Sequence, residues 1–364
     1  MSPLAPVLVL IGFIALTIGA EFLVRGASRL ALAFGITPLV VGLTVVAFGT
    51  SAPEAAVSVW SAATGEGGIA VGNVVGSNIF NILFVLGLSA LVAPLIVSQQ
   101  LVRLEVPILI GVSVVFFAMS LDGQIDRLDG ALLFAGVITY TVWAIHRSRR
   151  EKQEVADEYE AEFGGPPAEG RGSSVAVNLT WALGGVFLLV VGSRLLVTGA
   201  VDIAEYFKVS EVIIGLTIIS VGTSLPEVAT SVLASLRGER DIAVGNAIGS
   251  NLFNILAVFG LTGLVAPAGV AVAKTVLRFD MPVMIAVAVA VLPIFFSGHR
   301  IRRWEGGLMF AYYWVYLAFL ILTVVGHPGI ETLGRILVIF VLPLTMATLI
   351  FTTWRAWRTP VNPE

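Results

Sequence analysis

Long apolar segments alternate with short polar ones along almost the whole chain. Eleven segments are long and apolar enough to cross a membrane as helices, a crossing that needs about 20 mainly apolar residues. They are 4–24, 35–62, 69–93, 104–121, 130–146, 178–201, 209–236, 242–266, 279–297, 306–325 and 332–352. The pattern therefore predicts an all-α integral membrane protein with about 11 spans.

One long polar stretch, residues 147–176, interrupts this pattern. It is rich in charged residues, contains Gly-Gly-Pro-Pro and has no apolar periodicity. Such a composition is typical of a linker and not of a packed element. We predict a mobile linker between two membrane regions.

Composition agrees with this view and excludes several classes of protein. Of the 364 residues, 57% are hydrophobic and 12% charged, whereas about 25% are charged in ordinary soluble domains. The chain has no cysteine and a formal net charge of −3, which argues against a disulfide scaffold and a nucleic-acid binder. The N-terminus has no basic region before its apolar segment, so we expect a retained span and not a cleaved signal peptide.

The distribution of Lys and Arg predicts the orientation, since cytoplasmic loops are enriched in both. With the N-terminus outside, 15 of the 21 basic residues fall on the inside and five on the outside. We expect a multi-pass protein of the plasma (inner) membrane with a cytoplasmic linker.

An internal repeat predicts the architecture. Residues 35–97 and 208–270 share 33 identities in 63 positions at an offset of 173. Each half holds five predicted spans, and an odd number makes the second copy enter from the opposite side, which is an inverted repeat. The predicted units are a first repeat (1–146), the linker (147–176), a second repeat (177–326) and an extra C-terminal helix with its tail (327–364).

Two carboxylates occupy equivalent positions in this repeat, Glu54 and Glu227, near the middle of the second and seventh spans. An ionised side chain at the bilayer centre costs roughly 2.5–3.5 kcal/mol on insertion scales. A cation held between the two glutamates is the simplest reason to keep both.

A proline precedes each glutamate and should break its span. Pro53 and Pro226 clash with the carbonyls four residues earlier, which are those of Gly49 and Gly222. Irregular backbone at membrane depth is tolerated where it lines a cavity or is buried in protein. Hydroxyl groups flank both breaks, at Thr50, Ser51, Thr223 and Ser224. Carboxylate, hydroxyl and carbonyl oxygens are the ligands of a hard cation such as Ca²⁺.

The third and eighth spans add polar stripes. Asn73, Ser77 and Asn81 recur every four residues and so lie on one helix face. The second repeat has Asn246, Ser250 and Asn254 at the equivalent positions. Asn78 and Asn251 point elsewhere, and we expect each to pair with a neighbouring helix.

Glycines recur every seven residues in the first and sixth spans. They are Gly12, Gly19 and Gly26 in one span and Gly185, Gly192 and Gly199 in the other. A smooth glycine face allows close packing with little interlock of side chains. We interpret these two spans as a moving element that slides over the rest.

The paired motifs resemble those of the prokaryotic sodium/calcium exchangers of the cation/calcium exchanger superfamily. GTSAPE with GNVVGSNIFN, and GTSLPE with GNAIGSNLFN, are similar to the two α-repeats of that family. The resemblance covers residues 1–326 and implies ten core helices with ions bound between the repeats. It also implies that the first helices of the two halves slide across a bundle of the others.

The resemblance assigns ligands position by position. It implies Ca²⁺ binding by Glu54 and Glu227 with Thr50 and Thr223. It implies Na⁺ binding by Ser51, Ser77, Ser224 and Ser250 with backbone oxygens of Ala47 and Ser220. The central polar pair is Asn81 and Asn254, and members of the family often carry aspartate at the second of these. The eleventh span also departs from the ten-helix pattern.

We therefore expect a secondary antiporter that exchanges Na⁺ for Ca²⁺, with no cofactor and no enzymatic activity. Two carboxylates balance one Ca²⁺ or two Na⁺, and protons should compete for them at low pH. A Ca²⁺/H⁺ or other divalent cation/proton antiporter on the same scaffold remains an alternative. A cation channel is a further alternative. However, one ligand from each repeat favours a single occluded site over the row of open ion sites that a channel needs.

Overall fold

The computed structural model describes residues 4–163, 175–208, 220–296, 298–327, 329–330 and 334. Among these residues, eight helices are long and apolar enough to span a membrane. A bent pair, Pro38–Thr50 with Ala52–Ala63, makes a ninth. They coincide with predicted spans, whereas residues 209–219 and all of the predicted span 332–352 except Gly334 lie outside the described residues. The chain is thus a helical, multi-pass membrane protein.

Each predicted half contains a similar series of elements. The first half holds α1 (Ala5–Phe34), α2 (Pro38–Val41), η1 (Gly42–Val46), α3 (Ala47–Thr50), α4 (Ala52–Ala63), α5 (Gly67–Phe80), η2 (Asn81–Leu86), α6 (Gly87–Val92), β1 (Leu95–Ile96), η3 (Leu101–Glu105), α7 (Val106–Met119), η4 (Ser120–Asp122), β2 (Gln124–Ile125) and α8 (Arg127–Phe163). The second holds α9 (Val175–Tyr206), α11 (Ser220–Thr223), α12 (Leu225–Leu236), α13 (Arg240–Phe253), η6 (Asn254–Phe259), α14 (Gly260–Val265), β3 (Val270–Ala271), η7 (Val276–Asp280), α15 (Met281–Phe296), β4 (Arg300–Ile301) and α16 (Arg303–Val325).

Two spans form the centre of the molecule. The most apolar windows of Gly67–Val92 and Arg240–Val265 are 78% and 83% buried, against at most 33% for the other unbroken spans. Each contains a π-helical segment, η2 or η6, which begins at Asn81 or Asn254. π-Bulges occur frequently at functional sites.

The two halves interleave. Gly87 of α6 faces Gly306 and Phe310 of α16, while Gly260 of α14 faces Gly130 and Phe134 of α8. Two short antiparallel ribbons join the halves in the same way, since β1 pairs with β4 and β2 pairs with β3. Each half therefore completes its packing only with the other.

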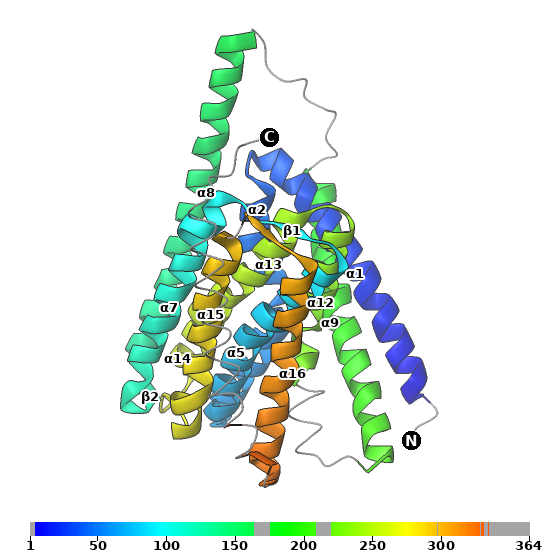
Figure 1. The fold of residues 1–364 in the computed structure, drawn as a ribbon, viewed down its shortest axis with the longest axis vertical. Coiled ribbons are helices and arrows are strands. Elements are labelled where there is room, and N and C mark those ends of the chain that lie inside the picture. Colours follow the sequence, from blue (N-terminus) through cyan, green and yellow to red (C-terminus); the bar gives the residue numbers. More distant parts are fainter. Residues whose placement is uncertain are drawn as a thin grey trace.

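The α1 and α9 helices form a pair along one flank of the molecule (Figure 1). A Cβ added at Gly19 would lie 2.9 Å from the carbonyl oxygen of Gly185, and one added at Gly12 would lie 2.7 Å from that of Gly192. Higher residue numbers in α1 thus meet lower ones in α9, so the helices are antiparallel. The two glycine stripes face each other. The stripes therefore pack α1 and α9 against each other and are not a surface against the rest of the molecule, whereas the prediction that the two spans form one moving element stays a prediction.

The α8 helix extends further than the sequence suggests. It continues to Phe163 and projects beyond the other helices in Figure 1, so the predicted linker 147–176 is helical over its first part. Residues 147–163 contain no Gly or Pro and are rich in Arg, Lys, Glu and Ala, which favour helices. Gly164 and Gly165 follow directly, and residues 164–174 lie outside the described part of the chain.

Candidate cation site

A break in each half places a glutamate at the start of a new helix. In the first half α3 ends at Thr50 and α4 begins at Ala52, with a bend of 48°. Ser51 between them has φ −79° and ψ 7°, and the equivalent Ser224 has φ −90° and ψ 9°. The proline-induced breaks are therefore confirmed. Glu54 lies in the first turn of α4, and Glu227 lies in the first turn of α12.

The two breaks meet and exchange hydrogen bonds. The Ser51 hydroxyl donates to Oε1 of Glu227 at 3.2 Å, and the Ser224 hydroxyl donates to Oε1 of Glu54 at 2.7 Å. Both glutamates are fully buried. The repeat thus brings the predicted carboxylates into one site, each carrying a hydroxyl from the other half.

The asparagine stripes support these breaks. The Asn73 amide donates to the Ser58 hydroxyl at 2.9 Å and to the Glu54 carbonyl at 3.3 Å, and its oxygen accepts from Thr223 at 3.4 Å. The second stripe repeats this set: Asn246 bonds to Ser231 (2.9 Å), the Glu227 carbonyl (3.4 Å) and Thr50 (3.0 Å). Each asparagine holds the helix that carries one glutamate against the break of the other half.

Two more serines complete the hydroxyl lining. Ser77 lies 3.1 Å from the hydroxyl of Ser224, and Ser250 lies 3.3 Å from that of Thr50. The Ala47 carbonyl accepts from Ser51 N at 3.0 Å and from the Thr50 hydroxyl at 3.3 Å. Ser220 begins α11, and its side chain lies outside the described part of the site.

Four asparagines join the central spans. The Asn81 amide donates to Oδ1 of Asn251 at 3.1 Å, and the Asn254 amide donates to Oδ1 of Asn78 at 3.3 Å. The expectation that Asn78 and Asn251 pair with a neighbouring helix is confirmed, since each bonds the other's span.

Four buried oxygens of the predicted ligand residues have no hydrogen-bond partner among the described residues. They are Oε2 of Glu54, Oε2 of Glu227, Oδ1 of Asn81 and Oδ1 of Asn254. A buried acceptor without a partner costs about 1–3 kcal/mol, and more if it is charged. Two carboxylate and two amide oxygens in equivalent positions of the repeat therefore match the chemistry of a bound hard cation.

Helix ends set the local electrostatics. The positive N-terminal ends of α4 and α12 stabilise the carboxylates in their first turns. The α3 and α11 helices end two residues before α4 and α12 begin, so carbonyl groups at their C-terminal ends add partial negative charge beside the carboxylates. Carboxylates at helix starts next to carbonyls at helix ends suit a site that holds positive charge.

Three contributing serines were not singled out from the sequence. Ser58 and Ser231 each follow a glutamate by four residues in both repeats, a repeated spacing that could have identified them. Ser193 of α9 donates to the Gly222 carbonyl, one of the carbonyls that a proline clash was expected to release. Its equivalent in α1 is Ala20, so the repeat gives no signal for Ser193.

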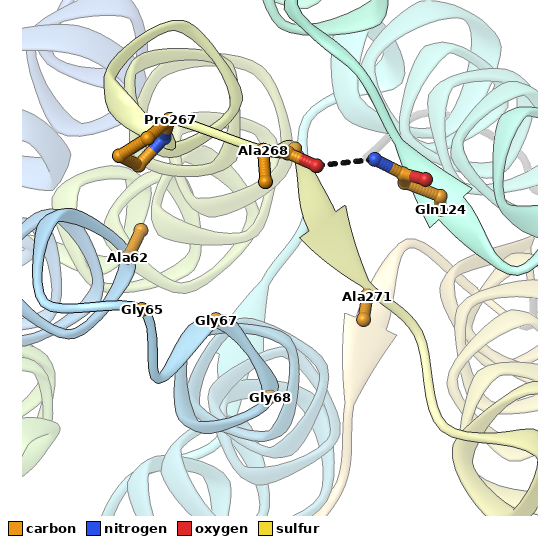
Figure 2. A pocket seen from close by; sticks show the side chains of 9 residues that line it. Ala62, Gly65, Gly67, Gly68, Gln124, Pro267, Ala268 and Ala271 are labelled. Atoms are coloured by element: carbon orange, nitrogen blue, oxygen red, sulfur yellow. Dashed lines mark hydrogen bonds between the residues drawn. The ribbon is translucent and has the colours of Figure 1, made fainter.

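A separate cavity of about 360 Å³ lies where the α4–α5 turn meets the β2–β3 ribbon (Figure 2). Glycine and alanine form most of its lining, and the Gln124 amide donates across it to the Ala268 carbonyl. The lining includes no charged residue. This cavity therefore lacks the ligands found at the buried site.

Comparison with known proteins gives one consistent result. The family model described as sodium/calcium exchanger protein matches residues 4–146 and 177–322. The putative antiporter CaxA of Alkalimonas amylolytica is 41% identical over 82% of this chain and 92% of its own length. The sodium/calcium exchanger MaX1 of Methanosarcina acetivorans is 30% identical over 86% of this chain and 97% of its own length.

A solved structure agrees with these relatives. The sodium-calcium exchanger NCX_Mj superposes with a TM-score of 0.74 at 29% identity, covering 88% of this chain and 100% of its own. Crystals of that protein have been soaked with Na⁺, Ca²⁺ and Sr²⁺.

Proposed function

Because the chain belongs to the sodium/calcium exchanger family, and is thus a membrane antiporter and not an enzyme, we propose that it exchanges Na⁺ for Ca²⁺. The exchange takes place at the buried site between Glu54 and Glu227. The four unpartnered oxygens of Glu54, Glu227, Asn81 and Asn254 carry this proposal.

Ca²⁺ is the ion that these oxygens suit best. It takes six to eight oxygen ligands at about 2.3–2.6 Å, including carboxylates that bind with one or both oxygens. Glu54 and Glu227 supply the charge, and the hydroxyls of Thr50 and Thr223 lie at the ends of the helices that lead into the site. Asn81 and Asn254 add neutral oxygens on the side of the central spans.

Na⁺ occupies the hydroxyl-rich flanks of the same site. The proposed ligands are Ser51, Ser77, Ser224 and Ser250, with backbone oxygens of Ala47 and Ser220. The short distances between Ser77 and Ser224 and between Ser250 and Thr50 support this, since each pair offers neighbouring oxygens beside a carboxylate.

Shared carboxylates couple the two ions. One Ca²⁺ or two Na⁺ neutralise Glu54 and Glu227, whereas the empty site would carry two buried negative charges. Moving an uncompensated charge through the membrane interior is costly. Only a loaded site therefore changes its access, and the downhill flow of one ion drives the other uphill.

Alternating access follows from two halves of opposite orientation. We assign residues 1–146 and 177–326 to two inverted five-span repeats, joined by the linker 147–176 and followed by an eleventh span within 327–364. The N-terminus lies outside, and the protein resides in the plasma (inner) membrane. Antiparallel packing of α1 against α9, its equivalent in the repeat, supports this arrangement.

A Ca²⁺/H⁺ antiporter is the second candidate. The same two glutamates can carry protons in place of Na⁺, and no residue of the site excludes that exchange. The hydroxyl-rich flanks favour Na⁺, because a carrier of protons alone does not need them.

The test is uptake of ⁴⁵Ca²⁺ into Na⁺-loaded proteoliposomes diluted into Na⁺-containing or Na⁺-free buffer. We expect uptake only with an outward Na⁺ gradient and a loss of about 100-fold or more in Glu54→Gln, since a ligand that is also a charge is removed. Uptake that is driven by a pH gradient and does not depend on Na⁺ would show that the coupling ion is H⁺ and not Na⁺. Failure under both gradients would remove Ca²⁺ as the substrate.

A further inference from the structure

Two of the four central asparagines, Asn78 and Asn251, form a closed ring of reciprocal hydrogen bonds that joins the two halves, and Asn81 and Asn254 each bond to this ring. Asn251 donates its amide to the Asn78 carbonyl at 3.1 Å, and Asn78 donates its amide to the Asn251 carbonyl at 3.4 Å. Their side-chain oxygens accept the amides of Asn81 and Asn254. All four residues are at most 1% exposed.

This ring fixes which atom of Asn81 and Asn254 faces the site. An asparagine side chain offers an oxygen acceptor on one side and an NH₂ donor on the other, so a flip exchanges them. The NH₂ group of Asn251 already donates to the Asn78 backbone carbonyl, which fixes the orientation of the Asn251 side chain. The atom that faces Asn81 is therefore the Asn251 side-chain oxygen, which can only accept a hydrogen bond. Asn81 must then turn its NH₂ group toward Asn251, which leaves its oxygen as the unpartnered atom. The same reasoning holds for Asn254 and Asn78.

We propose that Asn78 and Asn251 are positioning residues for the cation site. Each orients the amide of its partner so that an oxygen, and never an NH₂ group, is presented to the bound ion. Without them Asn81 and Asn254 could flip, and the positive end of an amide would face the cation. The proposal rests on the proposed function, which places the cation beside these oxygens.

Only asparagine satisfies both demands at these positions. Aspartate would keep the acceptor but lose the donor to the facing carbonyl. Serine or alanine would lose the acceptor that Asn81 or Asn254 requires. Glutamine adds a methylene group, which a fully buried contact between two helices cannot accommodate without displacement.

A double-mutant cycle tests this role, with equilibrium binding of ⁴⁵Ca²⁺ to the purified full-length chain as the readout. We expect Asn251→Ala to raise the Kd for Ca²⁺ about tenfold, the upper end of the effect of losing one hydrogen bond between neutral groups. In the Asn81→Asp background the same substitution should not weaken binding, because an aspartate at position 81 presents oxygen whichever way it turns.

Controls separate positioning from general damage. Asn251→Asp keeps the acceptor for Asn81 and should bind Ca²⁺ as tightly as the unsubstituted chain or more tightly. Ser89→Ala truncates a buried polar side chain in Gly67–Val92, the span that carries Asn81, and should leave Kd unchanged. Asn78→Ala with Asn254→Asp forms the mirror cycle and serves if Asn251→Ala does not fold.

An equal weakening by Asn251→Ala in both backgrounds would overturn the proposal. Binding equilibria are independent of transport, so the outcome is distinct from that of the exchange assay. A chain that binds Ca²⁺ and shows the cycle, but exchanges Ca²⁺ for another ion, would keep the positioning role and refute the Na⁺ coupling.

Discussion

The two ends of the cation site are built from nearly the same residues, yet they are enclosed to different degrees. Thr50 and Asn246, nearer the α12–α13 turn at Gly238, are fully buried. Their equivalents Thr223 and Asn73, nearer the α4–α5 turn at Gly65, are partly exposed. We call these the Gly238 end and the Gly65 end.

The ion pairs of the α1–α9 pair also differ between the two ends. Glu21 of α1 forms ion pairs with Arg25 and with Arg237 at the end of α12. The repeat places Arg194 and Thr64 at the positions of Glu21 and Arg237, and Arg194 makes no ion pair with any residue that the structure describes. The charged contact therefore holds the pair to α12 at the Gly238 end and has no counterpart at the Gly65 end.

A second contact also differs between the two halves, next to Thr223 at the Gly65 end. Ser193 of α9 donates to the Gly222 carbonyl, whereas Gly49 faces the Val186 side chain. The residues of the candidate site are thus nearly the same at both ends, whereas the contacts of the flanking helices differ.

The largest expected effect is the difference in access itself. The chain has no cysteine, so single substitutions can be labelled directly. We expect a small thiol reagent to modify Asn73→Cys on the order of tenfold or more faster than Asn246→Cys, because an enclosed side chain reacts only after local opening. Labelling rates in ion-free buffer measure this. Equal rates would contradict the asymmetry.

Removal of the Ser193 hydroxyl should come next in size. Ser193→Ala leaves the buried Gly222 carbonyl without this donor, and a net loss of about 0.5–1.5 kcal/mol corresponds to roughly 2- to 10-fold. In an Asn73→Cys background we expect labelling to accelerate by that factor, because Gly222 precedes Thr223, whose hydroxyl contacts Asn73. Thr198→Ala is the matched control, since its hydroxyl bonds to the Arg194 carbonyl of its own helix. A similar acceleration in that control would mean that α9 is simply less stable.

Loss of the ion pair should have a smaller effect. Glu21 is partly buried and both arginines are nearly half exposed, and such pairs contribute about 0.2–1 kcal/mol. Glu21→Gln should therefore accelerate Asn246→Cys labelling by about twofold to fivefold, and less at high salt. Glu66→Gln, an exposed acid at the opposite end, should not.

The mirror substitution sharpens the same comparison. Thr64→Glu places a carboxylate at the position equivalent to Arg237, where Arg194 can reach it if the pair shifts toward α4. We expect labelling of Asn73→Cys to slow by about twofold, whereas Thr64→Gln should have no effect. An unchanged rate in Thr64→Glu would show that Arg194 does not approach α4.

Much of the site could be predicted from the repeat and two local rules. Proline chemistry located the breaks at Ser51 and Ser224, and the repeat implied that Glu54 and Glu227 share one site. Four-residue spacing placed Asn73, Ser77 and Asn81 on a common face. These predictions depend on local backbone geometry, which the sequence specifies directly.

The remaining features depend on partners that spacing does not identify. The glycine stripes of α1 and α9 indicated a close contact but not that they meet each other. Asn78 and Asn251 were expected to pair, yet their effect on Asn81 and Asn254 requires the donor and acceptor geometry of the ring. The unequal burial of the two ends could not be predicted from the repeat, because a repeat describes only what the two halves share.

The two small ribbons carry a consequence for biogenesis. β1 pairs with β4 and β2 with β3, and each ribbon is extended by a matching backbone bond, Val97 N to the His299 carbonyl and Val272 N to the Gly123 carbonyl. A nascent first half would leave both of its strands with unpaired edges until the last third of the chain has been synthesised. Individual helices can insert into the membrane in order, but the first half can complete its packing only after β3 and β4 have been synthesised. Until then a membrane chaperone would encounter the first half with its two strand edges unpaired.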